Sequence, residues 1–194
     1  AAWQITLFMG FQSIGFYALL TWLPTLLQSY GYSPVEAGAW LSYASTIGLP
    51  LGLALHWLEG RLGGLSPTAA IAGSLAALGF AGLALAPTAA PWAWLALTGF
   101  GLGISFPVAL ALISARAHDP ATITVLSAMA QGFGYLIAGV GTWLVGVVHS
   151  STESWRWATL LLLLFAALQT WLGASAGRGD LVHADAAANS EGAA

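Results

Sequence analysis

Hydrophobic residues along this chain fall into six long, almost uninterrupted runs that are separated by short polar stretches. Each run is long enough for a helix to cross a bilayer core of about 30 Å at about 1.5 Å per residue. The pattern therefore predicts an all-α membrane protein with a six-helix transmembrane bundle over residues 1–175. The predicted spans are about 3–27, 37–58, 67–86, 92–115, 122–148 and 155–174.

Proline and glycine interrupt some of these runs. Ser33 followed by Pro34 is typical of a helix start, with Ser33 as the N-cap. Pro50 and Pro107 each remove a backbone hydrogen bond and are expected to kink the second and fourth spans. The spacings Gly48–Gly52 and Gly99–Gly103 indicate close helix packing and nothing more specific.

The connections and the C-terminal end predict an orientation. Arg61, Arg116 and Arg178 fall in the second and fourth connections and after the sixth span, whereas only Arg156 lies on the other side. Basic residues favour the cytoplasmic side of a membrane. Both ends are therefore expected in the cytoplasm, and residues 176–194, which are small, polar and aperiodic, are expected to form a disordered cytoplasmic tail.

Composition agrees with the membrane interpretation and excludes several functions. The chain is 58% hydrophobic and 6% charged, whereas a soluble domain has roughly a quarter charged residues. Its four basic residues cannot form a face that neutralises phosphates, so nucleic-acid binding is excluded. With no cysteine, thiolate chemistry is excluded, and no cofactor or metal site is expected.

The sequence does not predict an enzyme. A membrane metalloprotease would carry the HExxH motif, which is absent. Ser105 would need a buried histidine to act as a nucleophile, and all four histidines lie at span ends or beyond the last span. No charged residue lies at the centre of a span, so a buried proton relay is not expected either.

Neutral polar and aromatic residues are the candidates for a binding site. On the first span these are Gln12, Phe16 and Tyr17, and on the fifth span they are Gln131 and Tyr135. Amide and phenol groups can hydrogen-bond a small polar solute without the desolvation cost of a full charge. The alternative is that they form hydrogen bonds between helices, worth about 0.6 to 2 kcal/mol each in membranes.

Two segments resemble a known family. WQITLFMGFQSIGFYALLTWLPTLLQ, residues 3–28, is similar to the seventh helix of the cyanate transporter-like (CynX/NimT) branch of the major facilitator superfamily. SAMAQGFGYLIAGVG followed by LVGVVH, residues 127–149, is similar to its eleventh helix. The resemblance implies the C-terminal half of a twelve-helix permease, built as a 3+3 inverted repeat.

The resemblance has further implications. The first, second, fourth and fifth spans would line a cavity, and an N-terminal six-helix half would be the partner. The expected location is the bacterial cytoplasmic (inner) membrane, with several passes through the lipid bilayer. Because the chain opens on Ala1 rather than Met, a fragment of a longer protein is expected.

Two functions remain in competition. The first is a permease half that moves a small polar or anionic solute, such as cyanate, by alternating access. The second is a non-transporting six-span scaffold or assembly subunit whose polar residues pair with partner helices.

Overall fold

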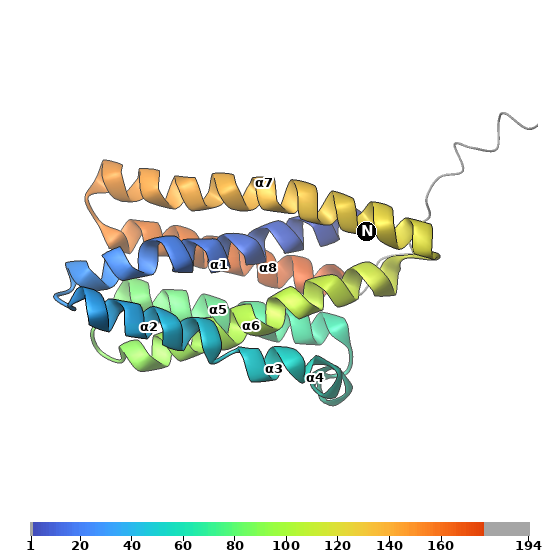
Figure 1. Ribbon diagram of the computed structural model, residues 1–194, viewed down its shortest axis with the longest axis horizontal. Coiled ribbons are helices and arrows are strands. Elements are labelled where there is room, and N and C mark those ends of the chain that lie inside the picture. The colour runs from blue at the N-terminus through green and yellow to red at the C-terminus, as the bar shows by residue number, and fades with distance from the viewer. Residues whose placement is uncertain (1, 177–194) are drawn as a thin grey trace, which may run out of the picture.

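Each apolar run of the sequence forms helix in the computed structural model, which describes residues 2–176 (Figure 1). Five runs form one long helix each, and the second run is divided into three. The helices are α1 (Ala2–Ser29), α2 (Pro34–Thr46), α3 (Leu49–Leu53), α4 (Leu55–Leu62), α5 (Leu65–Leu85), α6 (Pro91–Arg116), α7 (Pro120–Thr152) and α8 (Trp155–Ala176).

The length and composition of these helices agree with the predicted membrane bundle. Helices α1, α5, α6, α7 and α8 are each long and apolar enough to cross a bilayer. Helices α2 to α4 pass the same test together as one broken span, which bends by 68° between Leu53 and Leu55. The described residues thus contain five spans, or six with the broken one, and the all-helical fold class is confirmed.

The second span begins as the sequence predicts and then breaks. Ser33 is the N-cap of α2: its hydroxyl accepts from the backbone N–H of Glu36 at 3.3 Å, and Glu36 Oε2 accepts from the Ser33 N–H at 2.8 Å. Pro50 lies in the first turn of α3, where its missing N–H is tolerated. The proline thus starts a new helix, which is a larger disruption than the expected kink.

Glycines allow α2 and α3 to pack directly on the backbone of α6. A Cβ atom on Gly103 would lie 2.6 Å from the Gly48 Cα, and one on Gly52 would lie 2.5 Å from the Gly103 carbonyl oxygen. The two glycine pairs identified in the sequence therefore face each other, which confirms that they mark close packing.

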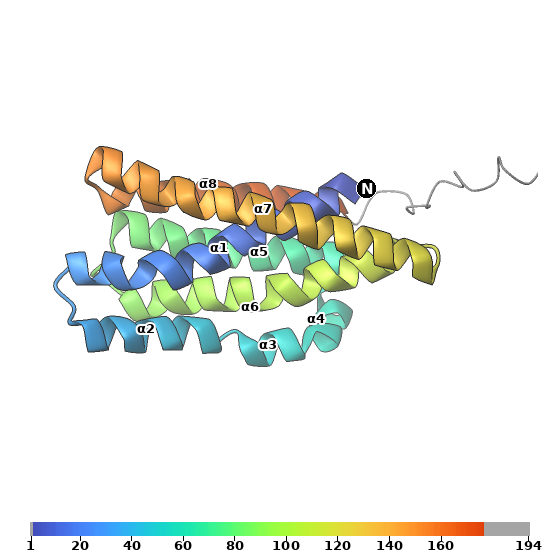
Figure 2. The ribbon, with the colours of Figure 1, turned by 45° about the horizontal axis from the view of Figure 1, so that its top comes forward.

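The long helices lie side by side in layers (Figures 1 and 2). Helix α1 packs on α7 and α8, while α5 packs on α6 and α8. Glycines on both helices allow α1 and α7 to approach closely. The side chain of Ile137 on α7 occupies the space where a Cβ on Gly10 would lie, and Gly134 on α7 faces Met9 on α1. Helices α2 to α4 run along the opposite side of the bundle from α7.

Both ends of the described chain lie at the same end of the bundle (Figure 1). There, Nη2 of Arg116, in the last turn of α6, donates to the backbone oxygen of Ala176 at 2.5 Å. The Arg116 side chain thus satisfies one of the carbonyl groups that the end of α8 leaves unpaired. The predicted disordered tail, 176–194, lies outside the described residues except for Ala176.

Candidate functional site

A cavity of about 590 Å³ opens between α1, α2, α3, α6 and α7. Its volume is in the range of small-molecule sites. Within the described chain, α5 and α8 contribute no side chain to its lining. This is the division of spans that the family resemblance implies, with the third and sixth spans outside the cavity.

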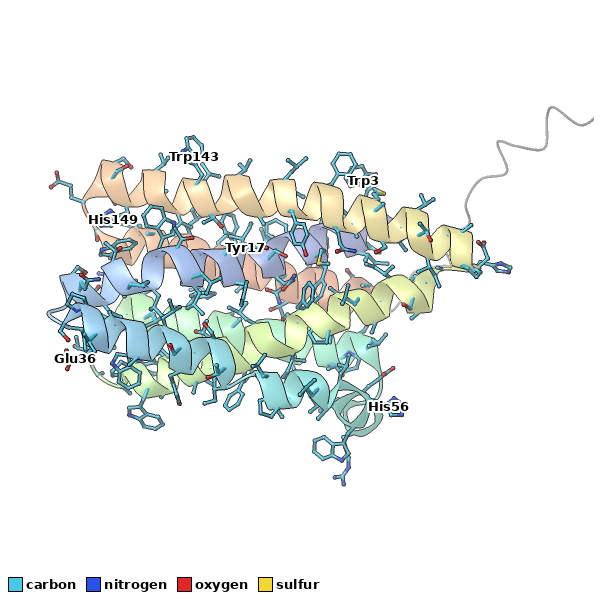
Figure 3. The ribbon with its side chains drawn as sticks, in the orientation of Figure 1. Trp3, Tyr17, Glu36, His56, Trp143 and His149 are labelled. Carbon is cyan, nitrogen blue, oxygen red and sulfur yellow. The ribbon has the colours of Figure 1, made fainter. Side chains whose placement is uncertain are left out.

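Four of the five predicted site residues line this cavity: Gln12, Phe16 and Tyr17 from α1, and Tyr135 from α7. The rings of Tyr17 and Tyr135 meet edge to face, with centroids 6.3 Å apart, and Phe16 contacts Tyr17 at 5.7 Å. Figure 3 shows Tyr17 about midway along the bundle. The two helices therefore present an aromatic cluster at the depth where a midplane solute site is expected.

Gln12 is oriented by its own helix. Its side chain is only 2% exposed, and Nε2 donates to the Ser13 hydroxyl at 2.7 Å and to the Met9 sulfur at 3.3 Å. Both contacts use the amide nitrogen, which leaves the amide oxygen for another donor. The Gln12 amide is thus held in a fixed orientation at the cavity wall.

Gln131 is the one predicted site residue that does not line the cavity. Its Nε2 donates to the Ser127 hydroxyl at 2.7 Å, one turn earlier on α7. The bond links two of the polar residues of this helix. A role for Gln131 in solute binding stays a prediction.

Sequence reasoning missed several lining residues. Ser13, Ser45 and Phe106 also face the cavity, together with small residues of α3 and α6. The hydroxyl oxygen of Ser45 is buried and has no hydrogen-bond partner among the described residues. The signal that could have identified Ser45 is its position three residues before Gly48, where the span breaks.

The chemistry of the cavity is neutral. Its described lining contains no Asp, Glu, Lys, Arg or His, and no cluster of His, Asp or Glu in the described chain could hold a metal ion. The groups that the lining offers to a ligand are therefore hydroxyl and amide groups and four aromatic rings, those of Phe16, Tyr17, Phe106 and Tyr135. Such groups suit a small polar solute with an apolar or planar body.

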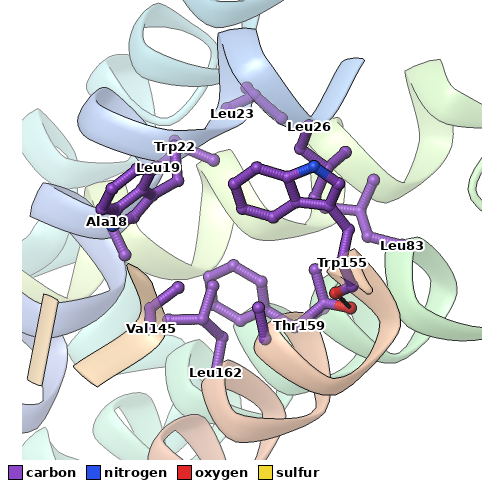
Figure 4. Close-up of a pocket in the computed structure, with 12 residues that line it drawn as sticks. Ala18, Leu19, Trp22, Leu23, Leu26, Leu83, Val145, Trp155, Thr159 and Leu162 are labelled. Atoms are coloured by element: carbon purple, nitrogen blue, oxygen red, sulfur yellow. Dashed lines mark hydrogen bonds between the residues drawn. The ribbon is translucent and has the colours of Figure 1, made fainter. Parts of the chain in front are cut away.

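A second cavity, between α1, α5, α7 and α8, is too small for a solute. It has about 20 Å³ of space, room for about one water, and its walls are almost entirely apolar (Figure 4). Its one polar side chain, Thr159, already donates to the backbone oxygen of Trp155 at 2.8 Å. This cavity is a packing gap between Trp22 and Trp155.

Comparison with known proteins identifies one family and several similar transporters. The family model described as the Major Facilitator Superfamily matches residues 1–139. The 2-nitroimidazole transporter of Escherichia coli (strain K12) is 35% identical over 181 residues, which cover 91% of this chain and 45% of that protein. The uncharacterized transporter YycB of Bacillus subtilis (strain 168) is 34% identical over 91% of this chain and 44% of its own length.

The cyanate transport protein CynX of Escherichia coli (strain K12) is 32% identical over 77% of this chain and 38% of its own length. The chain thus spans less than half the length of these curated relatives. No solved structure matches it.

Proposed function

Because the chain belongs to the major facilitator superfamily, whose members are transporters rather than enzymes, we propose that it is the C-terminal half of a twelve-helix permease for a small polar or anionic solute. The observation that carries this proposal is the neutral, aromatic cavity of about 590 Å³ lined by α1, α2, α3, α6 and α7. Transport proceeds by alternating access, as the two halves rock around a solute held at the midplane.

The partner in this proposal is an N-terminal six-helix half that covers the cavity. Phe16, Tyr17 and Tyr135 line the cavity and yet are 38%, 42% and 40% exposed. Exposed aromatic side chains that gather in one hollow are typical of an interaction surface. In the complete permease the second half closes over these rings, and it supplies any cation that an anionic solute requires.

The relatives suggest which solutes to test first. Their names give 2-nitroimidazole and cyanate, which are both small and differ in charge. In the proposed site the solute packs against the rings of Tyr17 and Tyr135, and the amide oxygen of Gln12 and the phenol groups form its hydrogen bonds. The bacterial inner membrane is the proposed location.

The first experiment is to read the coding sequence upstream of Ala1 and count its apolar spans. Six further spans support the half-permease assignment. Uptake of labelled 2-nitroimidazole and of cyanate is then measured in proteoliposomes that contain the complete transporter. Saturable uptake of either probe supports the proposed function.

Site variants connect that uptake to the cavity. Tyr135→Ala removes one ring and one hydroxyl from the cavity and is expected to raise KM about tenfold or more, because an aromatic contact and a hydrogen bond each contribute about 1 kcal/mol. Trp171→Ala is the matched control, since Trp171 is an exposed aromatic residue on α8, which does not line the cavity. No uptake of either probe, combined with loss of complex assembly in the Tyr135 variant, would favour the scaffold function instead.

A further inference from the structure

The sulfur of Met9 decides which end of the Gln12 amide is available. A side-chain amide has an acceptor oxygen and a donor nitrogen, and a hydroxyl such as that of Ser13 can bond to either. A thioether sulfur can only accept, and the Met9 sulfur lies 3.3 Å from the Gln12 Nε2. The amide nitrogen is therefore held by Met9 and Ser13, and the amide oxygen bonds to neither of them.

Helix α7 keeps this sulfur in place. The Met9 side chain is fully buried, and a Cβ atom on Gly134 of α7 would lie only 3.0 Å from the Met9 Cγ. Because Gly134 has no side chain, Met9 packs directly against the backbone of α7. Two of the helices that line the cavity thus act together to orient the Gln12 amide.

The Gln12 oxygen is left for a group outside the described chain. It accepts no hydrogen bond from a described residue, since both contacts of the side chain use the nitrogen. It is nevertheless not enclosed, because the buried side-chain atoms without a partner among the described residues are the hydroxyl oxygens of Ser45, Ser66 and Thr142. An unpaired oxygen that is not enclosed faces open space, and the open space that Gln12 lines is the cavity of about 590 Å³.

The other polar side chains of the described lining are less restricted than Gln12. They are the hydroxyl groups of Ser13, Ser45, Tyr17 and Tyr135. A hydroxyl can donate or accept, so it can pair with either kind of solute group. The Gln12 oxygen can only accept, so it distinguishes a solute that carries a hydrogen-bond donor from one that does not.

We propose that Gln12 determines specificity by accepting a hydrogen bond from an N–H or O–H group of the solute, with Met9 and Ser13 as positioning residues. The inference rests on the proposed transport function and narrows its substrate class. A site that pairs with a donor discriminates against an analogue without it, because the buried acceptor is then left unpaired. Of 2-nitroimidazole and cyanate, the site favours the first, which has a ring N–H, over the second, an anion with no hydrogen to donate.

The test compares two probes that differ in a single donor. Uptake of 2-nitroimidazole is measured in proteoliposomes that contain the complete transporter, against 1-methyl-2-nitroimidazole, in which a methyl group replaces the hydrogen of the ring N–H. For the wild-type protein we expect the methylated probe to have a KM roughly three- to tenfold higher, the effect of one hydrogen bond.

Gln12→Leu separates the lost hydrogen bond from the added bulk of the methyl group. The variant removes the acceptor, so the KM ratio of the two probes should fall toward one, whereas a steric effect of the methyl group would leave the ratio unchanged. Gln169→Leu is the matched control, because Gln169 is also buried and donates to a serine hydroxyl at 2.7 Å but does not line the cavity. Its ratio should stay at the wild-type value.

Ser13→Ala and Met9→Leu test the positioning of the amide. Each removes one of the two groups that hold the amide nitrogen, so the amide can turn that nitrogen toward the solute and the KM ratio should fall. A purely structural role would change the stability of the protein and leave the ratio as it is. A lower ratio in Gln12→Leu alone would keep Gln12 as the acceptor and remove Met9 and Ser13 from the proposal.

Three outcomes overturn the inference while the transport function stands. The first is a wild-type KM ratio of one. The second is a wild-type ratio in folded Gln12→Leu protein or, where that variant fails to fold, in Ser13→Ala. The third is saturable uptake of cyanate without uptake of 2-nitroimidazole. Absence of uptake of all three probes overturns the transport function itself.

Discussion

A buried hydrogen bond between Gln169 and Ser105 joins α8 to α6 through the interior of the bundle. Gln169 Nε2 donates to the Ser105 hydroxyl at 2.7 Å, and that hydroxyl donates in turn to the Gly101 oxygen at 2.7 Å. Both side chains are at most 1% exposed. Ser105 therefore has a structural role, which agrees with the expectation that it is not a nucleophile.

This bond predicts an order of stability for two variants. Ser105→Ala leaves the buried Gln169 amide unpaired and should lower the unfolding free energy by about 1 to 3 kcal/mol. Gln169→Leu replaces the amide by an apolar group of similar size and leaves Ser105 its bond to Gly101, so it should cost less than about 1 kcal/mol. Thermal unfolding of the purified protein in detergent measures both. A greater loss for Gln169→Leu would contradict the assigned role of the bond.

At the scale of single residues, sequence reasoning identified some side chains of the cavity and missed others for geometric reasons. Gln131 and Tyr135 are four residues apart, which rotates their directions by about 40° around the helix. Only Tyr135 reaches the cavity, because Gln131 bonds to Ser127 along α7. Ser45 was missed because the side of α2 that faces the cavity depends on its packing against α6.

At the scale of elements, the crossing of α2 and α3 over α6 depends on the absence of side chains. A Cβ atom on Gly99 would lie 2.6 Å from the Ile47 side chain and still closer to the Ala44 backbone oxygen. Gly99→Ala is therefore expected to lower the unfolding free energy by about 1 to 3 kcal/mol, as overpacking does.

Gly139 on α7 provides the control, since a Cβ there would have no described atom within 4 Å. Gly139→Ala should be neutral or stabilising by up to about 1 kcal/mol, because alanine favours the helix. Both melting temperatures are measured in detergent. An equal loss of unfolding free energy in the two variants would show that the close crossing over α6 does not set the effect.

The start of α7 should respond to pH. The Asp119 carboxylate caps this helix, accepting from the Thr122 backbone N–H at 2.9 Å and from its hydroxyl at 2.8 Å. These hydrogen bonds lower the pKa of Asp119 below its ordinary value of 3.8. A carboxyl whose pKa falls on folding stabilises the folded state above its unfolded pKa, and that contribution is lost as the pH falls through the folded pKa.

Asp119→Ala should accordingly unfold at a lower temperature than the wild-type protein at pH 7, because the helix loses its N-cap. The difference should shrink as the pH is lowered below about 3.8. Melting curves of both proteins at a series of pH values make the comparison. A difference that does not change with pH would mean that the charge of the cap contributes nothing.

At the scale of the whole molecule, hydrophobic patterning predicted six spans because a bilayer-length apolar run has few alternatives to a membrane helix. The break in the second span was only partly predicted. Gly48, Pro50 and Gly52 indicated an interruption, but the 68° bend that turns α4 away depends on contacts with α5 and α6 that no local pattern contains. Helix α8 does not line the cavity, and yet it buries Gln169 and packs on α5 and α1.

The arrangement of helix ends makes the membrane orientation testable. Helix α4, which carries Arg61, and the α6–α7 connection after Arg116 lie at one end of the bundle, while the α1–α2 and α7–α8 connections lie at the other (Figures 1 and 2). Only Arg156 is basic near that second end. The positive-inside rule then predicts that the Arg61 and Arg116 end lies in the cytoplasm.

Because the chain contains no cysteine, a single introduced cysteine reports the exposure of one position. Ser151→Cys at the end of α7 and Ala115→Cys at the end of α6 change two exposed residues at opposite ends of the bundle. A membrane-impermeant maleimide should label Ser151→Cys in intact cells and should label Ala115→Cys only after lysis. The reverse pattern would invert the orientation, and labelling of both in intact cells would contradict a six-span bundle that separates these two ends by a bilayer.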